Sequence, residues 1–273
     1  MTERDRTPQE RDLAAARRQR LLAVVEARRA VRLEELAAIL GVSAATVRRD
    51  LNALAAAGHL RRVHGGAVAV DARLDEPHFE AKAATAAAEK ERIAATAVGL
   101  LRPEDTVYLD SGSTVLALAR LLHGWDRLTV VTNSLPVAME LLGRGPRLIV
   151  VGGEVRPRSR AIVGPLTRRL LSELWLDRAV MGTFALSLED GLTTTDPAEA
   201  FTKELVMARA REVILLADHT KLGSRSFARA GDLDDVDILV TDDGIDERSL
   251  RALTRRGIRV VVARSRPGAG PQP

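Results

Sequence analysis

The stretch LEELAAILGVSAATVRRDLNALAAAGHLRRVHGG, residues 33–66, decides the fold of the N-terminal part of this chain. Two short amphipathic segments within it are separated by Gly41, Val42 and Ser43. The spacing predicts a helix over 33–40 that Gly41 ends in a left-handed conformation, and Ser43 is a good N-cap for the helix that follows. This is the pattern of a helix-turn-helix.

The helix after Ser43 is expected to be the recognition helix of this motif. Val47, Leu51 and Leu54 recur at i, i+4 and i+7, so they face the core and leave a short basic face outward. Arginine on such a face pairs with guanine edges or with phosphate. The residues predicted to contact DNA from this helix are Ser43, Thr46, Arg48, Arg49 and Asn52.

A small two-stranded wing is predicted after Gly58, in the run HLRRVHGGAV of residues 59–68. The alternative is an ordinary three-helix bundle with a solvated arginine face. Because the turn, the cap, the periodicity and the wing coincide, the sequence favours a winged helix-turn-helix that binds double-stranded operator DNA. The wing residues predicted to reach the sugar-phosphate backbone are Arg61, Arg62, His64 and Gly65.

The distribution of charge supports a DNA-binding N-terminus. Residues 1–66 carry 13 Arg and 8 acidic residues, a net of +5, which leaves −1 for the rest of the 273 residues. There is no Cys, which excludes disulfides and thiolate zinc sites, and we expect no metal or cofactor. No apolar run approaches transmembrane length and the N-terminus has no apolar leader, so we expect a cytoplasmic protein with no membrane contact.

Apolar runs from residue 106 onwards are separated by segments long enough for helices, which predicts an α/β fold with a doubly wound, mostly parallel sheet. A first helix is predicted over 17–27 and another over 86–101. The predicted strands are 106–109, 128–131, 148–151, 178–181, 213–217, 238–241 and 259–263. The predicted domains are a flexible arm 1–16, the winged helix-turn-helix 17–70, a linker 71–85, the α/β domain 86–265 and a mobile tail 266–273.

The loop DSGST follows the first of these strands and opens a helix of about 115–122. Free backbone N–H groups and the helix dipole attract anions at such a point, and hydroxyls with a glycine suit a phosphate. A helix start capped by its own side chain would look similar. The loop is neither a Walker A motif nor a dinucleotide fingerprint, which favours a small phosphorylated ligand. Its predicted ligand-binding residues are Asp110, Ser111, Gly112, Ser113 and Thr114.

Polar residues and glycines also follow other predicted strands directly, so these strand ends are suited to bind the same anion. Lys221 stands out because only four of the 41 basic side chains are Lys, and a compact ammonium suits a phosphate. Ordinary polar turns with a solvated Lys221 are the alternative. Further residues predicted to bind the ligand are Thr132, Asn133, Ser134, Gly152, Gly153, Gly182, Asp218 and Lys221.

Asp196 and Glu199 complete the predicted site, with two interpretations of equal weight. They are spaced as a capping box at the start of a helix, and they are equally suited to accept hydrogen bonds from ligand hydroxyls.

The motifs together resemble the DeoR family of bacterial transcriptional repressors. LGVS, TVRRDL and GHLRRVHGGA match its N-terminal signature, and DSGST, TNS, DRAVMGT, GLTTTDPAEA and DHTKLG match its sensor domain, so the resemblance extends from residue 17 to about 265. It implies a repressor of a carbohydrate-metabolism operon that responds to a phosphorylated sugar. The family often has Ser where this chain has His219, whose role the resemblance leaves open.

The sensor domain of that family is similar to ribose-5-phosphate isomerase, which raises an enzyme alternative. Such isomerases carry a Glu-Lys pair where this chain has Lys203-Glu204, so the catalytic base is displaced and we predict no catalytic residues. A purely architectural DNA binder that takes no ligand is a third hypothesis. One short recognition helix buries little surface, which favours a homo-oligomer, a dimer or tetramer, reading repeated half-sites.

Overall fold

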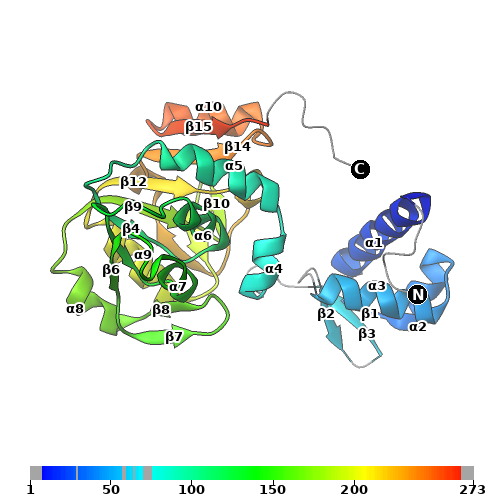
Figure 1. Cartoon of the computed structure of the whole chain (residues 1–273). Coiled ribbons are helices and arrows are strands. Elements are labelled where there is room, and N and C mark those ends of the chain that lie inside the picture. Colours follow the sequence, from blue (N-terminus) through cyan, green and yellow to red (C-terminus); the bar gives the residue numbers. More distant parts are fainter. Residues whose placement is uncertain (1–7, 29, 57–59, 64, 70–75, 266–273) are drawn as a thin grey trace. The chain divides into compact units, whose positions relative to one another are not determined.

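The computed structural model of the chain describes residues 8–28, 30–56, 60–63, 65–69 and 76–265 (Figure 1). It divides into two compact units, residues 1–81 and 82–273. His64, the predicted tail, residues 1–7 of the predicted arm and residues 71–75 of the predicted linker lie outside the described residues.

The N-terminal unit packs helices against a small antiparallel sheet with the strand order β1-β3-β2. Its core is aliphatic and includes Leu21, Leu36, Val47 and Leu51, which are fully buried. This arrangement confirms the predicted winged helix-turn-helix. Its elements are α1 (Pro8–Arg28), β1 (Ala30–Arg32), α2 (Leu33–Leu40), α3 (Ala44–Ala56), β2 (Leu60–Val63) and β3 (Gly66–Ala69).

The turn between α2 and α3 follows the prediction. Gly41 has φ +66° and its N–H donates to the carbonyl of Ala37, which ends α2. The hydroxyl of Ser43 accepts the N–H of Thr46 at 3.2 Å and so caps α3.

Two features of this unit differ from the prediction. Helix α1 begins at Pro8, inside the predicted arm, because proline suits the first helical turn and the residues after it are good helix formers. Strand β1 was not predicted, because it runs into α2 without a turn signal. Its backbone approaches the wing so closely that a Cβ on Gly66 would lie 2.3 Å from the carbonyl oxygen of Val31, which requires glycine at position 66.

The C-terminal unit is built on one seven-stranded sheet with the order β15-β14-β12-β9-β4-β5-β6, in which all neighbours are parallel. All seven predicted strands are confirmed within a few residues. Successive strands build outward in one direction from β4 and in the other from β9, so the topological switch point lies between β4 and β9. The strands are β4 (Thr106–Leu109), β5 (Thr129–Thr132), β6 (Arg147–Val150), β9 (Leu176–Gly182), β12 (Ala210–Leu216), β14 (Ile238–Asp242) and β15 (Arg259–Ala263).

Helices cover both faces of this sheet, as the doubly wound prediction requires (Figure 1). Tyr108, Met181 and Leu215 on one face share a core cluster with side chains of α8, α9 and α10. On the opposite face, α6 lies between α5 and α7 and contacts both, and all three helices contact strands of the sheet (Figure 1). The helices are α5 (Ala87–Val98), α6 (Ser113–Arg120), α7 (Leu135–Leu141), α8 (Arg168–Leu171), α9 (Pro197–Met207) and α10 (Glu247–Arg255), with short 3-10 turns η2 (Pro165–Thr167), η3 (His219–Lys221) and η4 (Leu233–Asp235).

The predicted linker is wrong in part, because it contains helix α4 (Phe79–Ala84). The sequence FEAKAA is rich in helix formers and Phe79 is buried. Short antiparallel strands were also missed, since runs of three or four residues have too little periodicity to stand out. These are β7 (Glu154–Arg156) paired with β8 (Ala161–Val163), and β10 (Ala185–Ser187), β11 (Gly191–Thr194) and β13 (Ala228–Gly231), which form one sheet.

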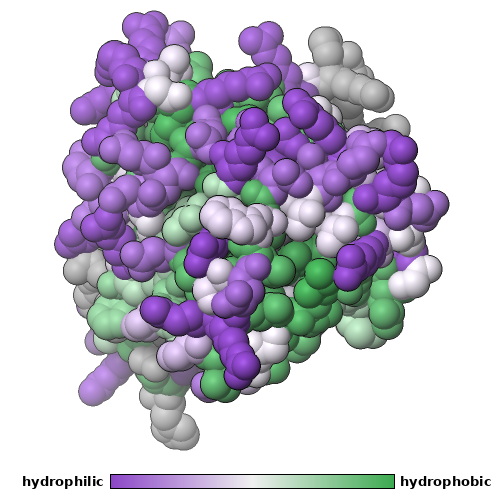
Figure 2. Space-filling view, turned by 90° about the vertical axis from the view of Figure 1, so that its left-hand side faces the viewer, coloured by the Kyte–Doolittle hydropathy of each residue, from purple (hydrophilic) through white to green (hydrophobic). Residues whose placement is uncertain are grey.

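Large apolar side chains are exposed beside edge strand β6. These side chains lie on α7 and its C-cap, on β6 and β7, and on η2, and each is at least 42% exposed: Met139, Leu142, Val150, Val155 and Leu166. Figure 2 shows the side on which α8 and β6 lie in Figure 1, and hydrophobic residues gather in its lower part. Among the described residues, no helix has the length and apolar character needed to span a membrane.

Candidate functional site

The recognition helix α3 presents the predicted DNA-contacting face. Arg48, Arg49 and Asn52 are exposed, whereas Val47 and Leu51 are fully buried on the opposite face. The capping hydroxyl of Ser43 also lies 3.0 Å from the hydroxyl of Thr46. The helix therefore exposes the guanidinium groups of Arg48 and Arg49 near its N-terminus, where a major-groove reader needs them.

The wing is tied to α3 by a hydrogen bond. Arg62 on β2 donates from Nη1 to Oδ1 of Asn52 at 2.6 Å. Arg62 also lines an open pocket of about 580 Å³ together with Glu34, Arg48 and Gly65. Asn52 thus holds the wing arginine beside Arg48, and its own amide oxygen is engaged within the protein.

An ion pair that the sequence did not reveal fixes α3 to α1. The carboxylate of Asp50, whose side chain is 2% exposed, accepts from Nε of Arg17 at 2.6 Å and from Nε of Arg18 at 3.2 Å. These arginines come from helix α1, so their charge serves to orient the recognition helix. The i, i+4 pattern of α3 gave no signal for this, because the partners lie 32 and 33 residues away.

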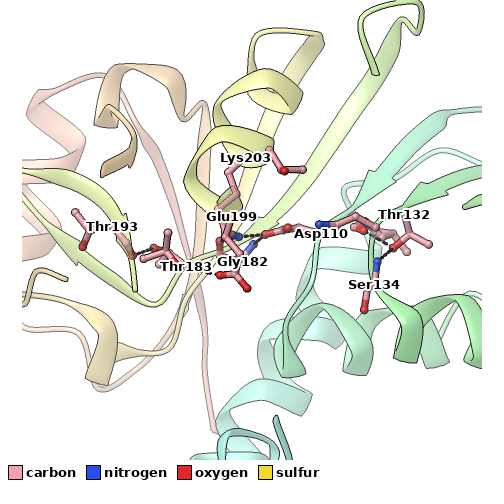
Figure 3. A network of polar contacts seen from close by, with 12 residues as sticks. Asp110, Thr132, Ser134, Gly182, Thr183, Thr193, Glu199 and Lys203 are labelled. Carbon is pink, nitrogen blue, oxygen red and sulfur yellow. Dashed lines mark hydrogen bonds and ion pairs between the residues drawn. The ribbon is translucent and has the colours of Figure 1, made fainter. Parts of the chain in front are cut away.

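The centre of the second unit is an ion pair at the switch point of the sheet (Figure 3). Asp110 follows β4 and is fully buried, and its Oδ2 accepts from Nζ of Lys203 and from the N–H of Gly182 at 3.0 Å. Nζ of Lys203 also donates to the carbonyl of Gly182 at 2.9 Å. The other carboxylate oxygen of Asp110 is buried and has no hydrogen-bond partner among the described residues.

Next to Asp110, helix α6 starts without a side-chain cap. Its N-cap residue is Gly112, with φ +150°, which has no side chain to cap the first turn. The interpretation of DSGST as an ordinary capped helix start is therefore not supported. Ser111 and Thr114 are buried beside this open N-terminus, whose free N–H groups suit an anion.

The residues at the carboxyl end of β5, Thr132 to Ser134, mainly hold the local fold. Thr132 donates its hydroxyl to the carbonyl of Leu109 at 2.6 Å, and Ser134 caps α7 by accepting the N–H of Val137. The amide of Asn133 donates to the carbonyl of Ile162 at 3.1 Å, while its Oδ1 is buried without a partner among the described residues. The buried Oδ1 of Asn133 is therefore the atom of this group that is placed to accept from a ligand.

The glycines after β6 and β9 have separate roles. A Cβ on Gly153 would lie 2.9 Å from Cγ2 of Ile162, so this glycine serves close packing, whereas Gly152 has open space around it. Gly182 supplies both its N–H and its carbonyl to the Asp110 and Lys203 pair.

Asp196 and Glu199 are both engaged within the protein. Asp196 caps α9 by accepting the N–H groups of Ala198 and Glu199 at 2.9 and 3.0 Å. Glu199 does not close a capping box, because Oε2 accepts from Thr194 at 2.9 Å and Oε1 from Arg156 at 3.2 Å. Arg156 also pairs with Asp196 at 3.2 Å. The predicted role of these carboxylates toward a ligand stays a prediction.

The loop after β12 carries Asp218 and Lys221. Asp218 is buried and accepts the N–H of Thr220 at 3.1 Å, and Nζ of Lys221 lies 5.6 Å from the ring centroid of Phe184. Lys90 of α5 is buried nearby: burial lowers its pKa to about 8, with Asp218 opposing and Lys221 and Lys82 adding to the decrease. Sequence reasoning missed Lys82, Lys90 and Lys203 as site residues, although the scarcity of lysine that singled out Lys221 applied to all four.

His219 is oriented by a carboxylate at the end of β14. Its Nδ1 lies 2.7 Å from Oδ2 of Asp242, and its ring packs where a Cβ on Gly244 would lie 2.4 Å away. Burial raises the pKa of Asp242, but the N–H groups of His219 and Gly244 and the His219 ring outweigh it and hold that pKa below its usual value. His219 therefore faces β14, away from the strand pair that carries Asp110.

Comparison with known proteins agrees with this architecture. A model of the DeoR-like helix-turn-helix domain matches residues 17–73, and one of the DeoR C terminal sensor domain matches residues 85–243. The chain belongs to the DeoR family. The transcriptional regulator GlpR of Haloferax volcanii is 36% identical over 91% of this chain and 98% of that protein.

Two further similarities complete the comparison. The glycerol-3-phosphate regulon repressor of Escherichia coli K12 is 34% identical over 84% of this chain and 91% of that repressor. The structure of ribose 5-phosphate isomerase A from Methanocaldococcus jannaschii aligns with a TM-score of 0.39 and 19% identity over 50% of this chain and 55% of that one. The relatives are named as transcriptional regulators, and this DeoR-family member is a DNA-binding transcriptional regulator.

Proposed function

We propose that the chain represses a carbohydrate-metabolism operon and that a phosphorylated sugar, bound at the carboxyl ends of β4 and β9, modulates its binding to the operator. The observation that carries the proposal is the pairing of an α6 N-terminus that has no side-chain cap with a buried Asp110 oxygen that has no hydrogen-bond partner within the described part of the chain. The first feature suits a phosphoryl group and the second needs a hydrogen-bond donor such as a sugar hydroxyl. One of the relatives is named a glycerol-3-phosphate regulon repressor.

The test measures thermal stability and operator binding with matched ligands. Ribose 5-phosphate, glucose 6-phosphate and glycerol 3-phosphate are each compared with the free sugar or glycerol and with inorganic phosphate. A ligand that binds the native state raises the Tm by mass action, so at least one phosphorylated compound should raise it while its free counterpart does not. The same compound should change affinity for DNA from the chain's own upstream region. The proposal is wrong if no phosphorylated compound changes either quantity.

On the DNA side, Arg48 and Arg49 carry the proposal. Arg48→Ala and Arg49→Ala should each weaken operator binding by about 1–3 kcal/mol at physiological salt. Arg20→Ala on α1 is the matched control, because Arg20 is an exposed arginine of the same unit outside the recognition helix. If Arg48→Ala and Arg49→Ala both bound the operator as tightly as Arg20→Ala, α3 would not be part of the DNA interface.

We infer that a second copy of this chain covers the apolar side chains beside β6. Helix-turn-helix regulators read two half-sites with two copies, and contiguous exposed apolar side chains mark interaction surfaces. Met139 and Leu142 are 70% and 66% exposed. The double substitution Met139→Asp and Leu142→Asp should therefore lower the molar mass measured by light scattering. An unchanged mass in the double variant would exclude this surface as the interface.

A further inference from the structure

The last turn of helix α4 is held by side chains that come from the sensor site. Nζ of Lys90 donates to the carbonyl of Lys82 and to that of Thr85 at 2.5 Å, and the hydroxyl of Ser113 donates to the carbonyl of Lys82 at 3.4 Å. These carbonyls lie at a helix end, where intrahelical N–H partners run out. Lys90 and Ser113 therefore cap α4 from outside, and they are neighbours because they share one acceptor.

Both donors also belong to the anion site. Ser113 is the first residue of α6, whose N-terminus has no side-chain cap. Two charged residues of the loop after β12 shift the pKa of Lys90: Asp218, just before η3, raises it, and Lys221, within η3, lowers it. Lys90 is only 5% exposed, so its ammonium lies among these groups and not in bulk water. A phosphoryl group at the start of α6 would meet the same hydroxyl and the same ammonium that now hold α4.

Helix α4 lies at the boundary between the two compact units of the chain. It runs from Phe79 to Ala84, and the division between the two compact units falls within it, after Ala81. The last turn of α4 therefore belongs to the C-terminal unit, and its first turn belongs to the N-terminal unit. Ala86, which lies between α4 and α5 and is the N-cap residue of α5, has φ +50°, a conformation that a non-glycine residue adopts only when its surroundings hold it.

We propose that Lys90 and Ser113 couple the sensor site to the linker helix: a phosphorylated ligand competes with the carbonyls of Lys82 and Thr85 for these two donors. Ligand binding then loosens the C-terminal end of α4, and this difference between the free and bound states gives the ligand its effect on operator binding. The inference rests on the proposed function, and it assigns a ligand-contacting role to Lys90, which the sequence had not singled out.

The decisive variant is Lys90→Met, which keeps most of the aliphatic stem and removes the ammonium. Arg92→Met on the same helix is the matched control, because Arg92 pairs at the surface with Asp243 and Glu89. Each protein is titrated with the phosphorylated compound that raises the wild-type Tm, and operator affinity is measured with and without saturating ligand. We expect Lys90→Met to weaken ligand binding at least tenfold and to bring the two operator affinities within twofold of each other, while Arg92→Met matches the wild type.

Hydrogen exchange separates coupling from a structural role. In the wild type and Arg92→Met, ligand should speed amide exchange in residues 79–86 at least threefold, and in Lys90→Met exchange there should be fast without ligand and unchanged by it. If Lys90→Met does not fold, Ser113→Ala decides instead, with a smaller loss of ligand affinity and a reduced exchange response. The coupling is wrong if the decisive variant keeps the wild-type ligand affinity and operator response. Absence of any ligand effect in the wild type would instead overturn the proposed function.

Discussion

Helices α6 and α9 both begin beside the Asp110 and Lys203 pair, yet their N-termini are treated in opposite ways. At α9, Asp196 caps the first turn and Arg156 and Thr194 engage Glu199. At α6, Gly112 offers no cap and one oxygen of Asp110 has no partner among the described residues. The same kinds of polar residue thus complete the fold in one place and leave unmet hydrogen-bonding capacity in the other. Only the second arrangement favours a ligand.

The largest effect on stability is expected at the ion pair of Asp110 and Lys203, which lies beside the uncapped N-terminus of α6, here called the open end. Asp110→Asn leaves the ammonium of Lys203 buried without a counter-charge, so the free energy of unfolding should fall by about 3–5 kcal/mol in urea denaturation. Adding Lys203→Met removes the orphaned charge and should recover part of that loss. If the single and double variants were equally destabilised, the two residues would not act as a pair.

A new carboxylate distinguishes the two helix ends directly. Ser113→Asp places a negative charge in the first turn of α6, where it occupies the N–H groups and repels a phosphoryl group, so ligand affinity measured by calorimetry should fall at least tenfold, about 1.4 kcal/mol. Ala198→Asp makes the same change in the first turn of α9 and should alter ligand affinity by less than twofold. Equal losses in both variants would mean that the phosphoryl group does not sit on α6.

The N-terminus of α9, which Asp196 caps and which is here called the closed end, is expected to contribute to the stability of the fold. Asp196→Ala removes the cap of α9 and should lower the free energy of unfolding by about 1 kcal/mol. Asp246→Ala, which removes the corresponding cap of α10, is the matched control and should cost a similar amount. A loss of ligand affinity beyond tenfold in Asp196→Ala, with Asp246→Ala unaffected, would favour the ligand-binding interpretation of Asp196.

The contrast between the two helix ends also shows what sequence can and cannot predict. Local signals located the helix-turn-helix, the seven strands and the loop DSGST, because caps, glycines and apolar periods are read within a few residues. The pairing of Asp110 with Lys203 joins positions 93 residues apart, and that of Arg156 with Glu199 joins positions 43 apart. No local pattern carries such information, so the open and closed ends looked alike. Helix α4 was missed because its alanine-rich sequence was interpreted as a linker.

The smallest expected effect is a dependence of ligand affinity on pH at the open end. Burial holds the pKa of Lys90 at about 8, so its charge is present below that pH and is lost above it. Asp218 favours the charge, while Lys82 and Lys221 oppose it. A phosphate monoester is already a dianion above pH 7, because its second pKa is about 6. Ligand affinity should therefore fall about fivefold between pH 7 and 9.5, which corresponds to a loss of about 1 kcal/mol of charge interaction.

Lys90→Arg sharpens this last prediction, because a guanidinium keeps its charge throughout that range. Ligand affinity of this variant, measured by calorimetry at the same pH values, should be nearly constant. A fivefold fall that persisted in Lys90→Arg would assign the titration to another group, such as Lys221. A flat profile in both proteins would mean that the charge of Lys90 does not reach the ligand, and the open end of α6 would then bind its anion through backbone N–H groups and hydroxyls alone.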